Sequence, residues 1–188
     1  MDISHWILMI AIVTFTVVAA LCDLRTKRLP NTLTVPAFVL ALVYHVSGGA
    51  IESGISGAAD GLVFALSGFA TGFGILLVLW FVGGGGGGDV KFMGALGAWL
   101  GAIMTVQVFL VSALLVLLGT VLVLTYEAAQ RGINRVRRGE HSPSDSDDDQ
   151  SNPDLAEARV RRRLMPYGVP VAVSTWLVLA ISELSRLG

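Results

Sequence analysis

The sequence predicts an all-α protein that crosses a membrane several times. Of its 188 residues, 54% are hydrophobic and only 14% are charged, and the mean hydropathy is +0.71. Several apolar stretches are close to the roughly 20 residues that a helix needs to cross a hydrocarbon core of about 30 Å. This composition excludes an ordinary soluble domain and makes the lipid bilayer the first expected partner.

The apolar stretches predict six transmembrane helices within a single domain of residues 1–188. They cover residues 3–22, 32–50, 61–82, 90–105, 107–126 and 167–185. The fourth and fifth helices are separated on length, because the uncharged residues 92–126 would form one helix of about 52 Å at roughly 1.5 Å per residue. That is too long for one crossing, so we expect a hairpin with its turn near Gly101–Gln107.

The first helix is expected to be a retained anchor and not a signal peptide, because only Asp2 and His5 precede it in place of a basic stretch. Cys22 is the one cysteine, so it cannot form an internal disulfide or a four-thiolate zinc site. Of the histidines, His5 and His45 are expected at outer helix ends and His141 in a loop, where they do not converge. A metal centre and a Ser-His hydrolase are therefore disfavoured, and we expect neither a metal nor a cofactor.

The basic residues predict the orientation, because Lys and Arg stay on the cytoplasmic side of short loops. Of thirteen, three lie in Arg25–Arg28, one is Lys91 and eight lie in residues 131–163, which leaves Arg186 for the other side. Six crossings with an outside N-terminus place all three basic loops in the cytoplasm. We therefore expect a multi-pass protein of the inner membrane.

The longest of these loops, residues 127–163, has basic flanks around an acidic centre that is rich in Ser, Pro and Asp. Its low apolar content predicts disorder, and anionic lipid headgroups could hold its flanks. The basic residues lack interleaved aromatic residues, and the acidic block cancels their charge, so nucleic-acid binding is not expected. We interpret the loop as a solvated connector.

Two aspartates lie at predicted cytoplasmic helix ends: Asp23 after the first helix and Asp89 before the fourth. A carboxylate at the edge of a bilayer costs free energy, so two on one side suggest shared chemistry. Two carboxylates in one site cannot easily both ionise, and one proton is retained. The ionised member can activate water while the protonated member polarises a peptide carbonyl, which is the division of labour in aspartic proteases.

The residues around the aspartates have features of their own. Six glycines occupy residues 83–88, and each costs about 1 kcal/mol in a helix relative to Ala, so we expect a pliable segment that another backbone can approach. Lys91 is expected either to meet the substrate or to extend to lipid headgroups. Pro30 fixes the turn before the second helix, which Asn31 or Thr32 can cap.

Small residues recur along the fourth helix at Gly94, Gly97 and Gly101. Spacings of three and four place them on one helix face, where a neighbouring helix can approach closely. We expect this packing to bring Asp89 toward Asp23.

These residues resemble the motifs of the type IV prepilin peptidases, within the GxGD group of membrane aspartyl proteases. The resemblance is carried by Gly86-Gly87-Gly88-Asp89-Val90-Lys91 with Ala95-Leu96-Gly97-Ala98-Trp99-Leu100-Gly101, by Asp23-Leu24-Arg25 with Leu29-Pro30-Asn31, and by Met165-Pro166-Tyr167-Gly168. It implies that Asp23 and Asp89 form the catalytic pair. It assigns roles in shaping the site to Gly86, Gly88, Lys91, Pro30, Asn31, Pro166 and Gly168. The implied reaction is removal of the short basic leader from prepilins or pseudopilins at the cytoplasmic membrane face.

The bifunctional members of this family carry a cytoplasmic insert with paired cysteines and also N-methylate the new terminus. This chain is similar to peptidase-only members that serve Tad/Flp-type pili. Three alternatives stay open, namely a presenilin-like intramembrane protease, a transporter or channel component, and a non-catalytic assembly scaffold. The sequence also leaves open the oligomeric state, the particular pilin, the sharing of the proton and the role of the glycine run and the acidic loop.

Overall fold

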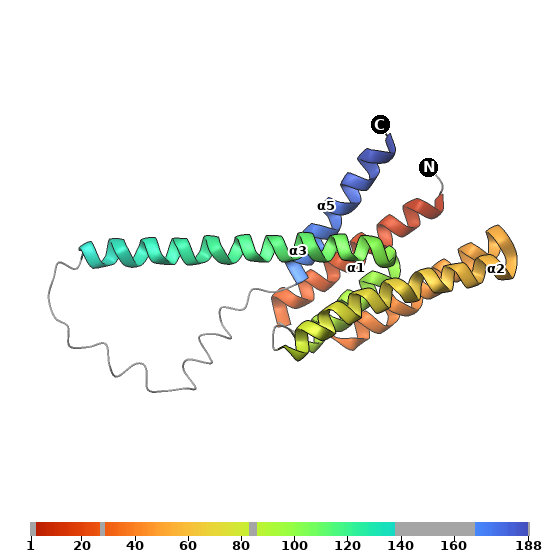
Figure 1. Cartoon of the computed structure of the whole chain (residues 1–188), viewed down its shortest axis with the longest axis horizontal. Coiled ribbons are helices and arrows are strands. Elements are labelled where there is room, and N and C mark those ends of the chain that lie inside the picture. The colour runs from red at the N-terminus through yellow and green to blue at the C-terminus, as the bar shows by residue number, and fades with distance from the viewer. Residues whose placement is uncertain (1–2, 27–28, 83–85, 138–167, 188) are drawn as a thin grey trace. The chain divides into compact units, whose positions relative to one another are not determined.

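The computed structural model describes residues 3–26, 29–82, 86–137 and 168–187. These ranges contain α1 (Ile3–Thr26), α2 (Asn31–Phe81), α3 (Gly87–Arg137) and α5 (Gly168–Leu187), as Figure 1 shows. Each of these helices includes a stretch that is long and apolar enough to cross a membrane. The all-α class is confirmed, with four candidate membrane-spanning helices where the sequence predicted six.

The chain divides into two compact units. The first comprises Met1–Leu115 and Pro166–Gly188, and the second comprises Val116–Met165. In the second unit, residues 127–137 are helical although the sequence predicted a disordered loop from residue 127. This stretch begins Glu-Ala-Ala-Gln-Arg, all strong helix formers, which explains the difference. The rest of the predicted loop, residues 138–163, lies outside the described ranges.

Within the first unit, α2 consists of two helices that meet at a break at Ser53 and Gly54. Gly54 has φ +66°, a left-handed conformation that glycine adopts at little cost. The sequence predicted separate helices at residues 32–50 and 61–82. The residues between them are instead helical up to the break and again after it, so the turn is much shorter than expected.

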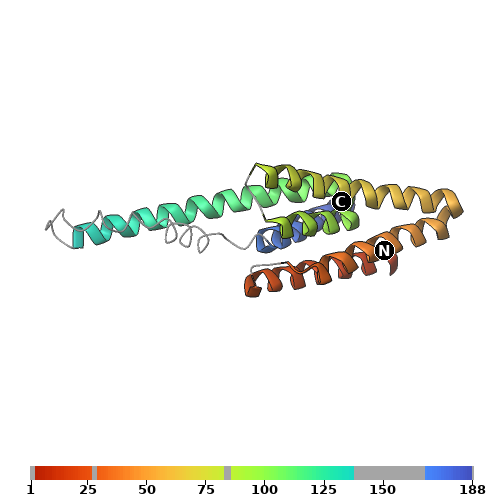
Figure 2. The same ribbon diagram turned by 90° about the horizontal axis from the view of Figure 1, so that it is seen from below.

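The two halves of α2 run side by side and antiparallel, with the turn at one end of the hairpin (Figure 2). Glycines allow this approach: a Cβ on Gly49 would overlap the carbonyl group of Gly57, and a Cβ on Gly61 would overlap that of His45. The two residues of each pair are equally far along the chain from the break at Ser53. These contacts therefore fix which residues of the two halves lie opposite each other. Close backbone contact through small residues is the usual way for helices to associate in lipid.

A second break divides α3 at Gly101, which has φ +75°. The chain folds back there, because residues from the two sides of the break face each other: a Cβ on Gly97 would lie 3.2 Å from Oγ1 of Thr105. The Thr105 hydroxyl donates a buried hydrogen bond of 2.6 Å to the Gly101 carbonyl, which satisfies a group that the break would otherwise leave unpaired. The predicted turn at Gly101–Gln107 is therefore confirmed at its first residue.

The segment of α3 before this break, residues 87–100, is the centre of the bundle. Residues 92–100 are all buried. Phe92 contacts Phe15 of α1 with ring centroids 5.4 Å apart, and the Trp99 indole N–H donates to the Ala37 carbonyl of α2 at 2.9 Å. At about 1.5 Å per residue this segment is about 21 Å long, which is shorter than a full crossing.

The glycine face predicted on this segment packs against the second half of α2. A Cβ on Gly68 would overlap the Gly97 carbonyl, and a Cβ on Gly72 would overlap that of Met93. Gly94 faces Phe69, whose ring carbon would lie 3.0 Å from an added Cβ. The expected close packing of this face is thus present, and the neighbour is α2.

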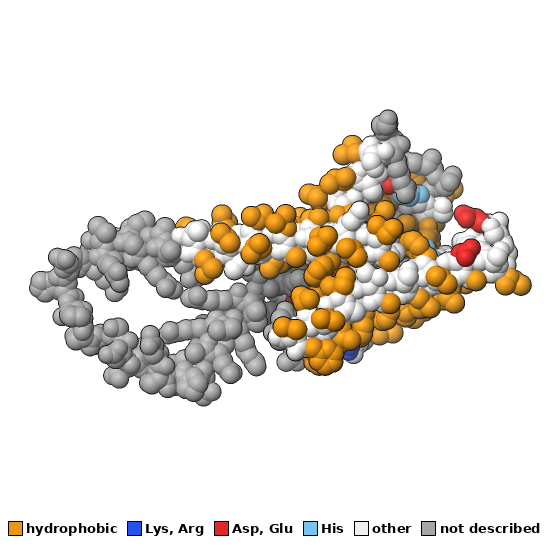
Figure 3. Space-filling view, in the orientation of Figure 1, with side chains coloured by type: hydrophobic (Ala, Val, Ile, Leu, Met, Phe, Trp, Pro, Cys, Tyr) orange, Lys and Arg blue, Asp and Glu red, His pale blue; other side chains and the backbone are white. Residues whose placement is uncertain are grey.

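Helices α1 and α5 run antiparallel, with both chain ends at the same end of the pair (Figure 1). The Trp176 indole of α5 donates to the Thr16 hydroxyl of α1 at 3.0 Å, and Nε2 of His5 lies 3.0 Å from Oε1 of Glu183. Apolar side chains cover much of the described surface in Figure 3, whereas acidic side chains gather at the turn of α2. Such a surface is suited to contact with lipid chains.

Candidate active site

Four stretches of the first unit meet at one end of the bundle. They are the C-terminal end of α1 with Asp23, the start of α2 at Asn31, the start of α3 with Asp89, and the start of α5 at Gly168. The hydrogen bonds described below join α1 to α5 and α2 to α3. The sequence motifs that are far apart in the chain are therefore assembled at one site.

Asp23 is held by the first residue of α5. Its side chain is buried, with 6% of its surface exposed, and its Oδ2 atom accepts a hydrogen bond of 2.7 Å from the backbone N–H of Gly168. A helix N-terminus carries a partial positive charge, so this position suits a carboxylate. A Cβ on Gly168 would lie 3.0 Å from the same oxygen and 3.1 Å from the Asp23 Cβ, which explains the glycine.

Asp89 lies in the first turn of α3 and is partly buried. Its Oδ2 atom accepts a hydrogen bond of 3.2 Å from the N–H of Gly86, and its own backbone N–H donates to the Gly86 carbonyl at 3.0 Å. This reciprocal pair fixes the carboxylate at the end of the glycine run. Asp23 lies near enough for a Coulombic interaction with the Asp89 carboxyl group.

Lys91 and Asn31 form a link between the starts of α3 and α2. The Lys91 Nζ atom donates a hydrogen bond of 3.0 Å to Oδ1 of Asn31. Asn31 therefore does not cap α2 as expected; the N-cap residue is Pro30, and no side chain caps this end. The Pro30 carbonyl instead accepts backbone N–H groups from Leu33 and Thr34 at 3.0 and 3.4 Å.

Gly88 lies beside the connection that leads from Asp23 to α2. A Cβ on Gly88 would be 3.5 Å from both the backbone N and the Cβ of Leu29, which is buried. Leu29 belongs to the motif Leu29-Pro30-Asn31, but no role in the site was predicted for it, although an apolar residue between Arg28 and Pro30 in a basic connection is a signal that could have indicated one. Pro166 lies outside the described residues.

The histidines are distributed differently from the prediction. His141 lies outside the described residues, but His5 and His45 line one cavity at the end of the bundle opposite Asp23. They come together because α1 and the first half of α2 are antiparallel, which places both near one end; the Tyr44 hydroxyl also donates to the Ser4 carbonyl there, at 2.7 Å. In the described part of the chain, no group of three His, Cys, Asp or Glu residues is placed to hold a metal ion.

Two neighbouring carboxyl groups, each anchored to a backbone N–H through one oxygen, can carry out acid and base chemistry together. A carboxylate that is held through one oxygen can still use the other to take a proton from water or to donate its own. The anchors fix both groups before substrate arrives, which reduces the entropy lost on reaching a reactive arrangement.

Long apolar helices with two interacting aspartates at one end define a multi-pass membrane protein with a carboxylate pair. The sequence profile of the type IV leader peptidase family matches residues 10–122, which include both aspartates, and the chain belongs to this family.

Two relatives are prepilin leader peptidase/N-methyltransferases. The protein from Neisseria gonorrhoeae is 29% identical over 134 residues, which are 68% of this chain and 40% of that protein. The protein from Escherichia coli strain K12 is 33% identical over 107 residues, which are 53% of this chain and 44% of that protein. The chain thus matches less than half the length of these relatives. No solved structure matches.

Proposed function

We propose that this protein is a prepilin leader peptidase, an aspartic endopeptidase that removes the short basic leader of prepilins or pseudopilins. The observation that supports this best is that Asp23 and Asp89 lie at the end where four chain segments meet, each held by a backbone N–H. Membership of a leader peptidase family and the printed names of the two relatives agree with it.

In the proposed reaction, the two carboxyl groups share one proton. The ionised member takes a proton from water as the oxygen attacks the scissile carbonyl, while the protonated member donates a hydrogen bond to the carbonyl oxygen. A tetrahedral diol forms, and the C–N bond breaks as a proton passes to the leaving amine. Neither step needs a metal or a cofactor.

We further propose that the site faces the cytoplasm. Six helical segments in alternating directions, with the N-terminus outside, bring Asp23, Arg25, Asp89 and Lys91 to one side. The segment of residues 87–100 starts at that side and is too short to reach the other interface. Its turn at Gly101 then lies inside the membrane, where the Thr105 hydroxyl satisfies it.

The proposed activity is limited to peptide cleavage, on pilins of the Tad/Flp type. In the bifunctional members of the family, methyl transfer accompanies an insert with paired cysteines. This chain has one cysteine, Cys22. Incubation of the purified protein with a radiolabelled methyl donor and a processed pilin tests this point. Methylation of the new N-terminus would contradict it.

Co-expression with a small Tad/Flp-type prepilin tests the central proposal. Asp23→Asn and Asp89→Asn are each expected to abolish the gel mobility shift that accompanies leader removal, while the protein stays inserted at normal levels. Asp60→Asn, at an exposed carboxylate near the turn of α2, is the matched control and should process normally. Unimpaired processing by both aspartate variants would reject the assignment.

A further inference from the structure

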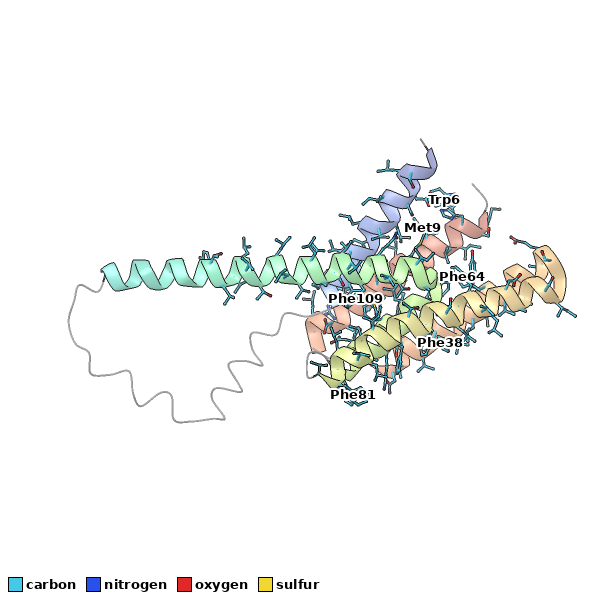
Figure 4. The ribbon with its side chains drawn as sticks, viewed as in Figure 1. Trp6, Met9, Phe38, Phe64, Phe81 and Phe109 are labelled. Carbon is cyan, nitrogen blue, oxygen red and sulfur yellow. The ribbon has the colours of Figure 1, made fainter. Side chains whose placement is uncertain are left out.

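A cavity of about 890 Å³ lies at the end of the bundle away from the two aspartates. Its walls come from α1, both halves of α2, the turn of α3 and the last part of α5. Met9 of α1 and Phe64 of α2, both labelled in Figure 4, are among the lining residues. A volume of this size is within the range of about 300–1,000 Å³ that is usual for small-molecule sites.

The cavity is a consequence of unequal helix lengths. Helices α1 and α5 contain 24 and 20 residues, which is about 36 and 30 Å at about 1.5 Å per residue. The central segment of α3 extends only about 21 Å before the chain turns back at Gly101. The space beyond that turn is bordered by its longer neighbours and filled by none of them.

The walls of this cavity are suited to hydrocarbon. Most of the lining side chains are apolar, and they belong to helices that can span a membrane. Three lining residues also have large exposed fractions, namely Ile103 at 78%, Ile181 at 58% and Phe64 at 44%. The cavity is therefore open at the surface, between helices that can span a membrane.

One end of the cavity is polar. His5 contacts Glu183 there, and Ser182 and Ser185 line the same part of α5. Both serine hydroxyls donate to backbone carbonyls of their own helix, so their oxygen lone pairs are left to accept. His5 lies in the first turn of α1, and the other three lie within the last six residues of α5, so all four are near helix ends, where lipid headgroups are expected.

We propose that this cavity binds a membrane phospholipid, with one acyl chain along the apolar walls and the headgroup at His5 and Glu183. Water is a poor occupant of the apolar part, because apolar walls offer too few hydrogen bonds and such a space stays dry. An empty space would forfeit the dispersion contacts of its lining. An acyl chain restores those contacts and enters sideways from the bilayer, where lipid is the solvent.

Trp99 provides a direct test, because it lines the cavity and is otherwise only 6% exposed. A variant that keeps Trp99 as its single tryptophan is made by replacing Trp6, Trp80 and Trp176 with Phe. Reconstituted into vesicles of phosphatidylcholine with brominated acyl chains, it should lose most of its fluorescence. The loss should approach that of a variant that keeps only Trp176, which is 41% exposed. Acrylamide in the water should quench Trp99 weakly.

Variants in which a side chain fills the cavity distinguish quenching by lipid inside the cavity from quenching by lipid at the outer surface. Ala102→Phe places a ring among the lining residues and should restore the Trp99 fluorescence, while the same substitution leaves Trp176 quenched as before. Ser67→Leu, on another wall, repeats the test if Ala102→Phe does not fold. Absence of bromine quenching, quenching that persists in both filled variants, or stronger quenching by acrylamide than by the brominated lipid would each overturn the proposal.

Discussion

Replacing Gly168 with Ala tests whether the first residue of α5 positions Asp23 for catalysis. The added Cβ would lie 3.0 Å from Oδ2 and 3.1 Å from Cβ of Asp23, so the buried aspartate has to move by some tenths of an ångström. That movement lengthens the hydrogen bond of 2.7 Å from the Gly168 N–H. A hydrogen bond to a charged group contributes about 1.5–3 kcal/mol, so a loss of roughly 10- to 100-fold in cleavage rate is expected.

Cleavage of a purified prepilin by the reconstituted enzyme measures this effect. The loss should fall on kcat with KM little changed, because the role proposed for Asp23 is in the chemical step and not in leader binding. Gly87→Ala is the matched control near the site: a Cβ there meets nothing within 4 Å, and the variant should cleave normally. If Gly168→Ala, folded and inserted, cleaves within twofold of the unchanged protein, the positioning role of Gly168 is refuted.

Three further predictions concern the links between helices. Asn31→Ala and Lys91→Met should each reduce the cleavage rate about fivefold, because each removes the same hydrogen bond of about 1 kcal/mol. The double variant should lose no more activity than either single variant. Additive losses in a double-mutant cycle would show that the two residues act separately. Gly68→Ala should lower the free energy of unfolding by about 1–3 kcal/mol, because the added Cβ overlaps a carbonyl group of α3. Gly74→Ala is the control: its Cβ meets nothing within 4 Å, so it should be neutral or stabilising by up to about 1 kcal/mol. Equal Tm values of the two variants in detergent would contradict this prediction. Gly101→Ala places an L-residue in a left-handed conformation, which costs about 1–2 kcal/mol, and the added Cβ overlaps an aromatic ring of α2. The Tm of this variant should therefore also fall. An unchanged Tm would argue against the turn as described.

The sequence contained enough information for the helical class and for one of the two hairpin turns. An uncharged stretch too long for one crossing had to fold back, and Gly101 was the residue able to allow it. The turn of α2 was placed less well, because Ser, Gly, Ala and Glu between the two apolar stretches looked like a loop. They are compatible with a helix, and only Ser53 and Gly54 leave it.

The atoms that hold the candidate site were beyond the reach of sequence patterns. The basic loops indicate which side Asp23 and Asp89 share, but not that Gly168 donates to one and Gly86 to the other. Asn31 was expected to cap its helix, because an amide beside Pro30 has that local option; a tertiary partner, the Lys91 ammonium, binds it instead. The shared cavity of His5 and His45 likewise depends on the direction in which two helices pack.

The hydrogen bond from Gly168 to Asp23 spans 145 positions of the chain. During synthesis, Asp23, the α2 hairpin and Asp89 all leave the ribosome long before α5 exists. Until α5 inserts, Asp23 lacks the N–H that holds it, and the carboxylate pair is incomplete. If Asp23 and Asp89 are the catalytic pair, we therefore expect a nascent chain to cleave poorly until α5 docks against α1.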